Sequence, residues 1–189
     1  MPTTRRTVPM VGALALVAVA LVALALSCGG DDPPDDPPPT TAAPTTTTES
    51  VESEVEAAYT AYREMVTRLL QAPDPDDPEI AQRATGETQD QLIESLRSLR
   101  EQGRAVRIGD QYGFDVVSVE LVNDVSALLQ DCAVDDAQTV DVATGAVVSE
   151  GLATALFPVT MRFEDGSWLV AETPEPTEVW EGVGGCAVD

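Results

Sequence analysis

Residues 29–50 cannot contribute to a hydrophobic core, and this segment limits where the chain can fold. It contains six prolines and four aspartates, and it has no valine, isoleucine, leucine or aromatic residue. Prolines favour extended polyproline geometry and aspartates repel one another, so the composition predicts a disordered linker. The linker separates an N-terminal segment from a region of about 140 residues, which is long enough to build one core.

The first 27 residues have the pattern of an export signal. Arg5 and Arg6 precede an apolar stretch that runs from Pro9 to Leu26. A basic start, an apolar stretch and small residues before a break are typical of secretory signals. The arginines are expected on the cytoplasmic side of the membrane. The arginine pair also leaves the twin-arginine export route open beside the general one.

Cys28, with Ser27 before it and Gly29 after it, resembles the lipobox of bacterial lipoproteins. Ala25 and Leu26 depart from the family pattern, which has leucine and a small residue at these positions. The resemblance implies that a diacylglycerol is attached to the cysteine sulfur and that the chain is cut before it. Two acyl chains would anchor the protein stably.

This interpretation divides the chain into a signal peptide (1–27), a lipidated cysteine with a disordered linker (28–50) and a folded domain (51–189). It places the domain on the outer face of the cell membrane, held there by lipid. An uncleaved anchor remains an alternative, since about 18 apolar residues are just enough to span a bilayer. Plain secretion is the second alternative.

The folded region begins with helical periodicity and ends with strand periodicity. Apolar residues recur in steps of three and four from Val51 to Leu70, which predicts a helix of about five turns. A short helix is expected over 77–84, stopped by Gly86, and a third helix ends at Gly103. Strand patterns follow at 106–108, 114–122, 127–134, 140–142, 146–148, 153–163 and 168–171.

Helices followed by a meander of about four to six strands predict an α+β fold, with the sheet wrapped around the long helix. The hairpin around Asp165-Gly166 is the clearest turn, because alternating segments flank it on both sides. Pro158 lies inside a strand pattern, which indicates an edge strand or a bulge.

Several short stretches, taken in order, resemble actinobacterial exported lipoproteins with an NTF2-like cone domain. They are AAYTAYREM (57–65), ATG (84–86), QDC (130–132), DVATG (141–145), DGSWLV (165–170) and the terminal Cys186. The resemblance implies a cone in which one long and two shorter helices pack in a curved antiparallel sheet. It implies a fold and a location, and it assigns no reaction.

The cysteine count is consistent with export. If Cys28 carries lipid, Cys132 and Cys186 remain, and an even remainder outside the cell predicts one disulfide bond. The bond would close a loop of about 55 residues, contribute roughly 4 kcal/mol in the chain-entropy model, and hold a tail that starts near Thr173. Two free thiols are the alternative, and a catalytic cysteine is disfavoured because no histidine or lysine is present to lower its pKa.

Charge and composition exclude several classes of function. The net charge of −23 repels nucleic-acid phosphates, so nucleic acid is not expected as a partner. The absence of histidine excludes mechanisms that depend on that side chain. No cofactor or metal is expected: Asp131, Asp135 and Asp136 flank Cys132, but their spacing differs from that of a calcium-binding loop and indicates a polar turn.

Asp115 is the one candidate for an acid inside the cone. Alternation places it on the same face as Val117 and Val119, where burial would raise its pKa and suit a general base. A tyrosine would then supply the hydrogen-bond donor: Tyr59, Tyr62 or Tyr112. Its place at a strand start, beside the turn at Gly113, favours exposure to water instead.

Four arginines form a candidate patch for an anionic ligand: Arg97, Arg100, Arg104 and Arg107. The first three have the spacing of one side of a helix, where lipid headgroups or an anionic polymer would bind. Pairing with Glu94 and Glu101 is favoured in a chain this acidic.

The predicted function is that of a membrane-tethered, extracytoplasmic domain that is not an enzyme and that binds or assists another component. Its expected partners are the membrane, an envelope protein or a small hydrophobic ligand. One alternative is a small-ligand carrier or an NTF2-like enzyme with a pocket aspartate. Another is an accessory subunit of an envelope transport or secretion complex.

Overall fold

The computed structural model describes residues 48–186, and its folded unit is a domain of three helices and two antiparallel sheets. The predicted signal peptide and Cys28, with the linker up to residue 47, lie outside the described residues. Within the described part, none of the helices combines the length and the apolar character needed to cross a membrane.

The three helices precede the strands, as predicted. Helix α1 spans Thr48–Gln71, α2 spans Ile80–Arg83 and α3 spans Gly86–Glu101. The apolar stripe of α1 is buried, with Val55, Tyr59 and Leu69 at most 1% exposed. Gly86 was expected to stop the second helix. It begins the third instead, where its φ of +58° suits a residue without a side chain.

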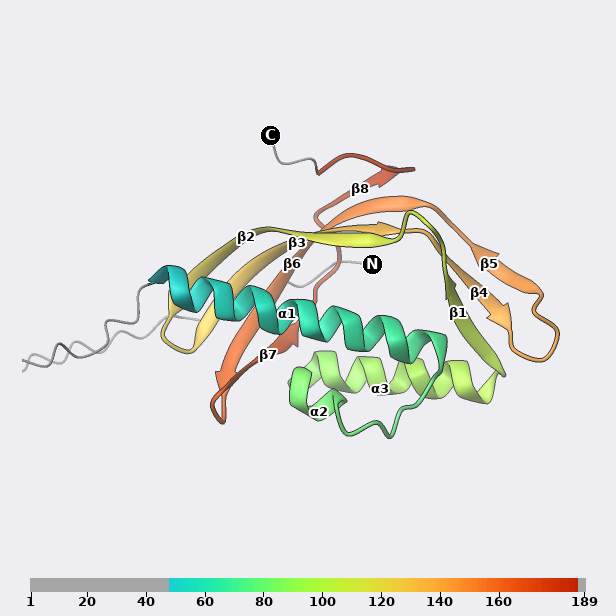
Figure 1. Cartoon of the computed structure of the whole chain (residues 1–189), viewed down its shortest axis with the longest axis horizontal. Coiled ribbons are helices and arrows are strands. Elements are labelled where there is room, and N and C mark those ends of the chain that lie inside the picture. The colour runs from blue at the N-terminus through green and yellow to red at the C-terminus, as the bar shows by residue number, and fades with distance from the viewer. Residues whose placement is uncertain (1–47, 187–189) are drawn as a thin grey trace, which may run out of the picture. The chain divides into compact units, whose positions relative to one another are not determined.

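The strands form two sheets (Figure 1). In the larger sheet the order is β2-β3-β6-β7, and β8 pairs with β6; in the smaller sheet the order is β1-β4-β5. The bounds are Arg104–Ile108 (β1), Gly113–Asn123 (β2), Ser126–Asp135 (β3), Ala137–Asp141 (β4), Val147–Glu150 (β5), Ala153–Glu164 (β6), Ser167–Glu172 (β7) and Glu178–Glu181 (β8).

Strand β6 explains how a proline fits into this sheet. Its second half pairs with β7 and its first half, Ala153–Leu156, pairs with β8. Pro158 lies between these two paired segments, so on that side β6 is locally an edge, where a residue without an N–H is tolerated. Strand β8 lies in the tail, where no strand was predicted.

Helix α1 lies along the concave face of the curved sheet, and α2 and α3 lie beside β7 (Figure 1). The core forms where the stripe of α1 meets the inner residues of the sheet, including Leu129, Val159 and Met161. This arrangement confirms the predicted α+β fold with a curved antiparallel sheet around a long helix.

Candidate functional site

A pocket of about 520 Å³ opens where α1, the large sheet and the small sheet meet; we call it the cone pocket. Its apolar lining residues come from five elements and the loop before β2: Val66, Leu70, Val106, Ile108, Tyr112, Ala133, Val134, Ala137 and Phe157. Its ionisable side chains are Arg63, Asp135 and Glu150, besides the phenol of Tyr112. A mainly apolar cavity with few polar groups is typical of small-ligand sites.

Arg63 belongs to a buried polar cluster behind this pocket. Its Nη1 lies 3.0 Å from Oδ2 of Asp131, and the hydroxyl of Tyr59 donates to the same oxygen at 2.5 Å. The guanidinium carbon lies 5.0 Å from the centroid of the Phe114 ring, a cation–π distance. We call Tyr59, Arg63 and Asp131 the buried triad.

Local geometry explains why these side chains meet. Tyr59 and Arg63 are four residues apart on α1, so they share one face of the helix. Asp131 lies in the middle of β3, where alternation turns it inward together with Leu129 and Ala133. It is 0% exposed, so its charge depends on the two donors.

Burial perturbs the titration of the buried triad. It raises the pKa of Asp131, against the lowering effect of Arg63 and of the Tyr59 hydrogen bond. It also raises the pKa of Tyr59 far above its usual range, and that of the adjacent Tyr62 to about 12. The pKa of Arg63 is raised as well: burial lowers it, but the neighbouring acidic groups more than compensate. Arg63 is therefore a permanent cation.

Two polar atoms of this cluster have no partner among the described residues: Nε of Arg63 and Oδ1 of Asp131. Buried polar atoms normally make hydrogen bonds. Both atoms are themselves buried, although the Arg63 side chain as a whole lines the cavity.

Known proteins resemble this chain in structure and not in sequence. No protein-family model matches it, and no curated protein matches it significantly. Among solved structures, the intermembrane-space region of the chloroplast protein ARC6 is similar, with a TM-score of 0.54 and 13% identity over 65% of this chain and 94% of that chain.

Two further similar structures have lower scores. One is a ketosteroid isomerase-like protein from Erwinia carotovora atroseptica SCRI1043, with a TM-score of 0.40 and 23% identity over 62% of this chain and 88% of that one. The other is a protein of the NTF2-like family from Streptomyces avermitilis, with a TM-score of 0.36 and 12% identity over 66% and 94% of the respective chains. The fold assignment rests on the long helix held against a curved antiparallel sheet, with two shorter helices beside it. The domain has an NTF2-like fold.

Asp115 does not line the cone pocket; it lines a separate hollow beside the disulfide of Cys132 and Cys186. It is exposed in β2, as its place at a strand start favoured, and the alternative that placed it inside the cone is wrong. The register of β2 against β3 shifts between Val116 and Ser118. This irregularity puts Phe114 and Val116 on the inner face and leaves Asp115 outside.

Sequence reasoning missed the acid that is inside the cone. Asp131 was expected in a polar turn, but it lies within β3 and faces the core. The signal was present: Ala127, Leu129 and Ala133 alternate with polar or exposed residues and share the parity of Asp131.

The predicted disulfide bond is present between Cys132 and Cys186, whose Cα atoms lie 5.9 Å apart. Cys132 follows Asp131 in β3 and therefore points to the opposite face. The bond holds the tail after β8 against this outer face, where Thr154 also donates a hydrogen bond to the carbonyl of Gly182.

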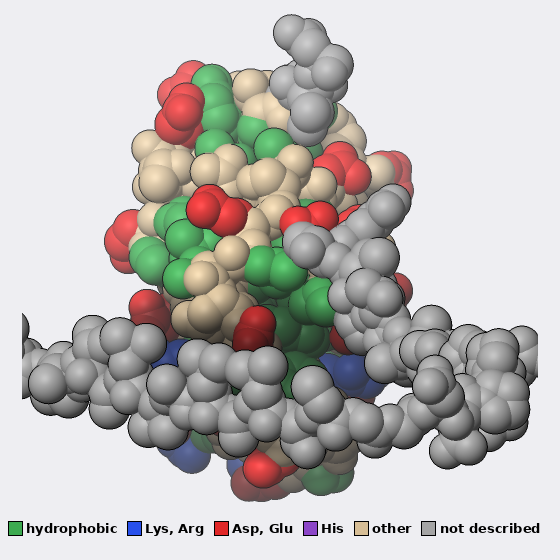
Figure 2. Space-filling model, turned by 90° about the vertical axis from the view of Figure 1, so that its left-hand side faces the viewer, with side chains coloured by type: hydrophobic (Ala, Val, Ile, Leu, Met, Phe, Trp, Pro, Cys, Tyr) green, Lys and Arg blue, Asp and Glu red, His purple; other side chains and the backbone are tan. Residues whose placement is uncertain are grey.

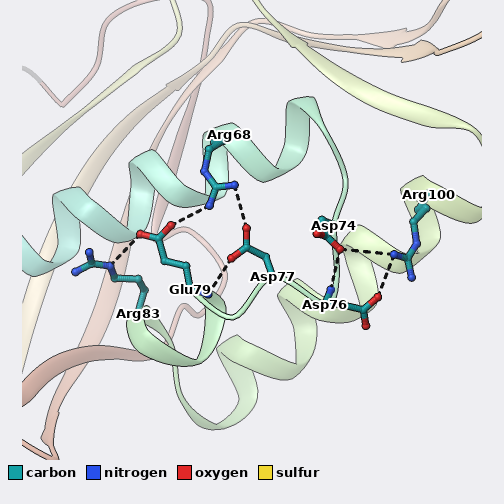
Figure 3. A network of polar contacts seen from close by, with 7 residues as sticks. All are labelled: Arg68, Asp74, Asp76, Asp77, Glu79, Arg83 and Arg100. Atoms are coloured by element: carbon teal, nitrogen blue, oxygen red, sulfur yellow. Dashed lines mark hydrogen bonds and ion pairs between the residues drawn. The ribbon is translucent and has the colours of Figure 1, made fainter.

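The three arginines expected on one side of a helix, Arg97, Arg100 and Arg104, do not all lie on one helix. Arg104 and Arg107 lie in β1, because α3 ends at Glu101 before Gly103, whose φ is +62°. Arg97 pairs with Glu94, and Arg100 pairs with Asp76 at 3.1 Å, shown in Figure 3. The pairing of Arg97 with Glu94 agrees with the favoured interpretation, whereas Arg100 pairs with an acid outside its own helix.

Carboxylates are plentiful on the surface, but they are not arranged for metal binding. In the part of the chain that the structure describes, no three His, Cys, Asp or Glu side chains lie close enough to hold an ion. On the face shown in Figure 2, acidic side chains are scattered among apolar ones, and few arginines are visible.

Proposed function

We propose that this protein is a membrane-tethered lipoprotein on the outer face of the cell membrane, and that its NTF2-like domain binds a small, mainly apolar molecule without transforming it. The observation that carries the proposal is the cone pocket of about 520 Å³, whose walls combine apolar side chains with one arginine and two carboxylates. The predicted export signal, lipidation of Cys28 and disulfide bond support the location.

The position of the buried acid supports binding rather than catalysis. A general base must come within hydrogen-bond reach of the proton that it removes. Asp131 is 0% exposed and is not among the pocket-lining residues, while Tyr59 and Arg63 occupy one of its two oxygens. We assign it a positioning role toward Arg63.

Photolabelling of the full chain in nanodiscs tests the pocket. An uncharged alkyl probe with a photoreactive group is expected to label peptides from α1 and β1 that line the cone pocket. Ala133→Phe, which fills the pocket from β3, should abolish most of this labelling. The matched control is Gln130→Phe, which adds the same ring to the exposed outer face of β3. Equal labelling of both variants would contradict the proposal.

Cys28→Ala tests the tether. Without the sulfur, the lipid cannot be attached, so the chain should be released or should persist as an uncut precursor. Cell fractionation and intact-mass measurement distinguish these results. Unchanged membrane retention with an unchanged mass would contradict lipidation and favour the uncleaved anchor.

A further inference from the structure

The C-terminal tail is attached to the large sheet at its edge, and we call residues 177–186 the strap. Strand β8 in the strap pairs with the first half of β6. Beyond β8, the hydroxyl of Thr154 donates to the carbonyl of Gly182 at 2.9 Å and accepts from the amide of Gly184 at 3.1 Å. The disulfide bond to Cys132 fixes the far end of the strap. One covalent bond and a set of hydrogen bonds at a sheet edge therefore hold this segment.

The strap lies outside the hydrophobic core. None of residues 177–186, all of which the structure describes, belongs to the core cluster. Val179 and Val183 are 61% and 57% exposed, and Trp180 is only half-buried. Segments with few buried apolar contacts open at a lower cost than the core does. Loss of the disulfide bond should therefore open the strap without opening the cone.

A hollow of about 540 Å³ gives access to the disulfide bond, since both of its cysteines line the hollow. Both cysteines are half-buried rather than enclosed. The other lining residues come from the strap and from β2, β3 and β6: Asp115, Val134, Thr154, Val183, Gly184 and Gly185. A disulfide bond that borders such a space can be reached by an attacking thiolate, which is the first requirement of thiol–disulfide exchange.

Asp115 places a negative charge beside this bond. It lies directly across from Cys132 in the register of β2 against β3, and it lines the same hollow. The Cβ atoms of residues so paired are about 5 Å apart. Exchange requires a thiolate to approach and another thiolate to leave, so a nearby carboxylate opposes the reaction. Asp115 therefore slows exchange at this site.

We infer that Cys132–Cys186 is a thiol–disulfide exchange site that controls the strap, and that its substrate is a dithiol. One thiolate of the dithiol attacks one cysteine sulfur, the S–S bond breaks, and the other sulfur leaves as a thiolate. The second thiol of the dithiol then displaces the first cysteine. The dithiol is thereby oxidised to a disulfide, and its two protons pass to Cys132 and Cys186.

The reduced protein has a released strap and an unpaired edge on the first half of β6. The cone stays folded, because its core includes no part of the strap. The exchange site lies on the opposite face of β3 from Asp131, so the inference is independent of the ligand proposed for the cone pocket.

Hydrogen exchange of the full chain in nanodiscs, before and after treatment with dithiothreitol, tests this inference. Dithiothreitol should make the thiols of Cys132 and Cys186 titratable and raise the exchange rates of the strap amides about tenfold or more. Amides of α1 and β3 should change by less than about twofold, because the core does not depend on the strap. A bond that resists dithiothreitol, a strap that stays protected after reduction, or faster exchange throughout the domain would each overturn the inference.

The matched control is the double variant Cys132→Ala and Cys186→Ala. Its strap amides should exchange as fast as those of the reduced wild type, with or without dithiothreitol. Slow exchange in this variant would show that hydrogen bonds alone hold the strap, and it would equally overturn the control assigned to the disulfide bond.

Asp115→Asn tests the charge beside the bond. Reduction by excess dithiothreitol at low salt should be about threefold faster in this variant, because the attacking thiolate no longer meets a carboxylate. Glu120→Gln removes the same charge from an exposed position of β2 that does not line the hollow, and it should change the rate by less than about 1.5-fold. Equal acceleration in both variants would assign the effect to the net charge of the chain and overturn the role of Asp115.

Discussion

Two arginine–carboxylate clusters on the same helix show how strongly the environment determines what an ion pair does. In the buried triad, the side chains of Arg63 and Asp131 are 17% and 0% exposed. We call Arg68, Asp77 and Glu79 the surface cluster (Figure 3). Arg68 lies 3.0 Å from Asp77 and 2.9 Å from Glu79, but its side chain is 52% exposed. The distances are the same, so exposure is the variable that differs.

This difference in exposure determines what each ion pair contributes to the protein. Water already solvates the surface cluster, so its pairs contribute little to stability. The buried triad has given up its hydration, and each member depends on the others. A buried pair can therefore hold Arg63 in one orientation and one charge state for the pocket, which a solvated pair cannot do.

The largest predicted effect comes from Asp131→Ala. Removing one partner of a buried pair leaves an uncompensated charge, so the free energy of unfolding should fall by about 3–5 kcal/mol. Urea denaturation followed by circular dichroism measures the loss. The control is Asp115→Ala on the exposed face of β2, which should cost less than about 0.5 kcal/mol. Similar losses for the two variants would show that burial does not distinguish them.

The second prediction concerns the other face of β3. Replacing both Cys132 and Cys186 by alanine removes a cross-link that spans 54 residues of sequence. The free energy of unfolding should fall by roughly 2–4 kcal/mol, because the unfolded chain gains freedom. The buried triad should persist, since its contacts lie on the inner face.

The measurement is the melting temperature with and without reductant. Reductant should lower that of the wild type by several degrees and leave the double variant unchanged. An equal response in both proteins would mean that the disulfide is not the origin of the shift.

Local periodicity was sufficient to predict most of the fold. The apolar stripe of α1 and the alternation of β6 are patterns among neighbouring residues, so short windows of sequence are enough to predict these two elements. Gly86 was misassigned because a glycine with positive φ can end one helix or begin the next. Strand β8 escaped prediction because it forms by pairing with β6 and is held by a disulfide, both of which are long-range contacts.

The candidate site was harder to predict, for the same physical reason. Tyr59 and Asp131 are 72 residues apart, and nothing in local spacing brings them together. Alternation traced back from Val119 made Asp115 a candidate for the inner face, although its place at a strand start favoured exposure. The irregularity between Val116 and Ser118 breaks that alternation, and Asp115 is exposed. The inward position of Asp131 was predictable from parity, but its partner on α1 was not.

The third prediction concerns the surface cluster. Arg68→Ala removes the contacts to Asp77 and Glu79, yet the melting temperature should fall by only about a degree or two at low salt. High salt should erase this difference, because exposed charges are screened. Arg68→Lys keeps the charge and serves as the control. A loss as large as that of Asp131→Ala, or one unaffected by salt, would contradict the comparison.

The smallest and most specific prediction is that two aspartates titrate on opposite sides of the ordinary value of 3.8. The amide of Glu79 donates to Asp77 at 2.8 Å and, together with Arg68, lowers the pKa of Asp77. Burial raises the pKa of Asp131. Carboxyl carbon NMR on the folded chain measures both pKa values directly, with Asp77→Asn and Asp131→Asn assigning the signals.

The two shifts affect stability with opposite signs. The folded state binds the proton of Asp77 less tightly than the unfolded state does, so Asp77 stabilises the fold above pH 3.8, and this contribution is lost as the pH falls through the lowered pKa. The folded state binds the proton of Asp131 more tightly, so its contribution declines as the pH rises from 3.8 through the raised pKa. Asp77→Asn should therefore destabilise the domain at neutral pH and become indistinguishable from the wild type in strong acid. If Asp131 titrated below Asp77, the distinction between the buried and the surface cluster would fail.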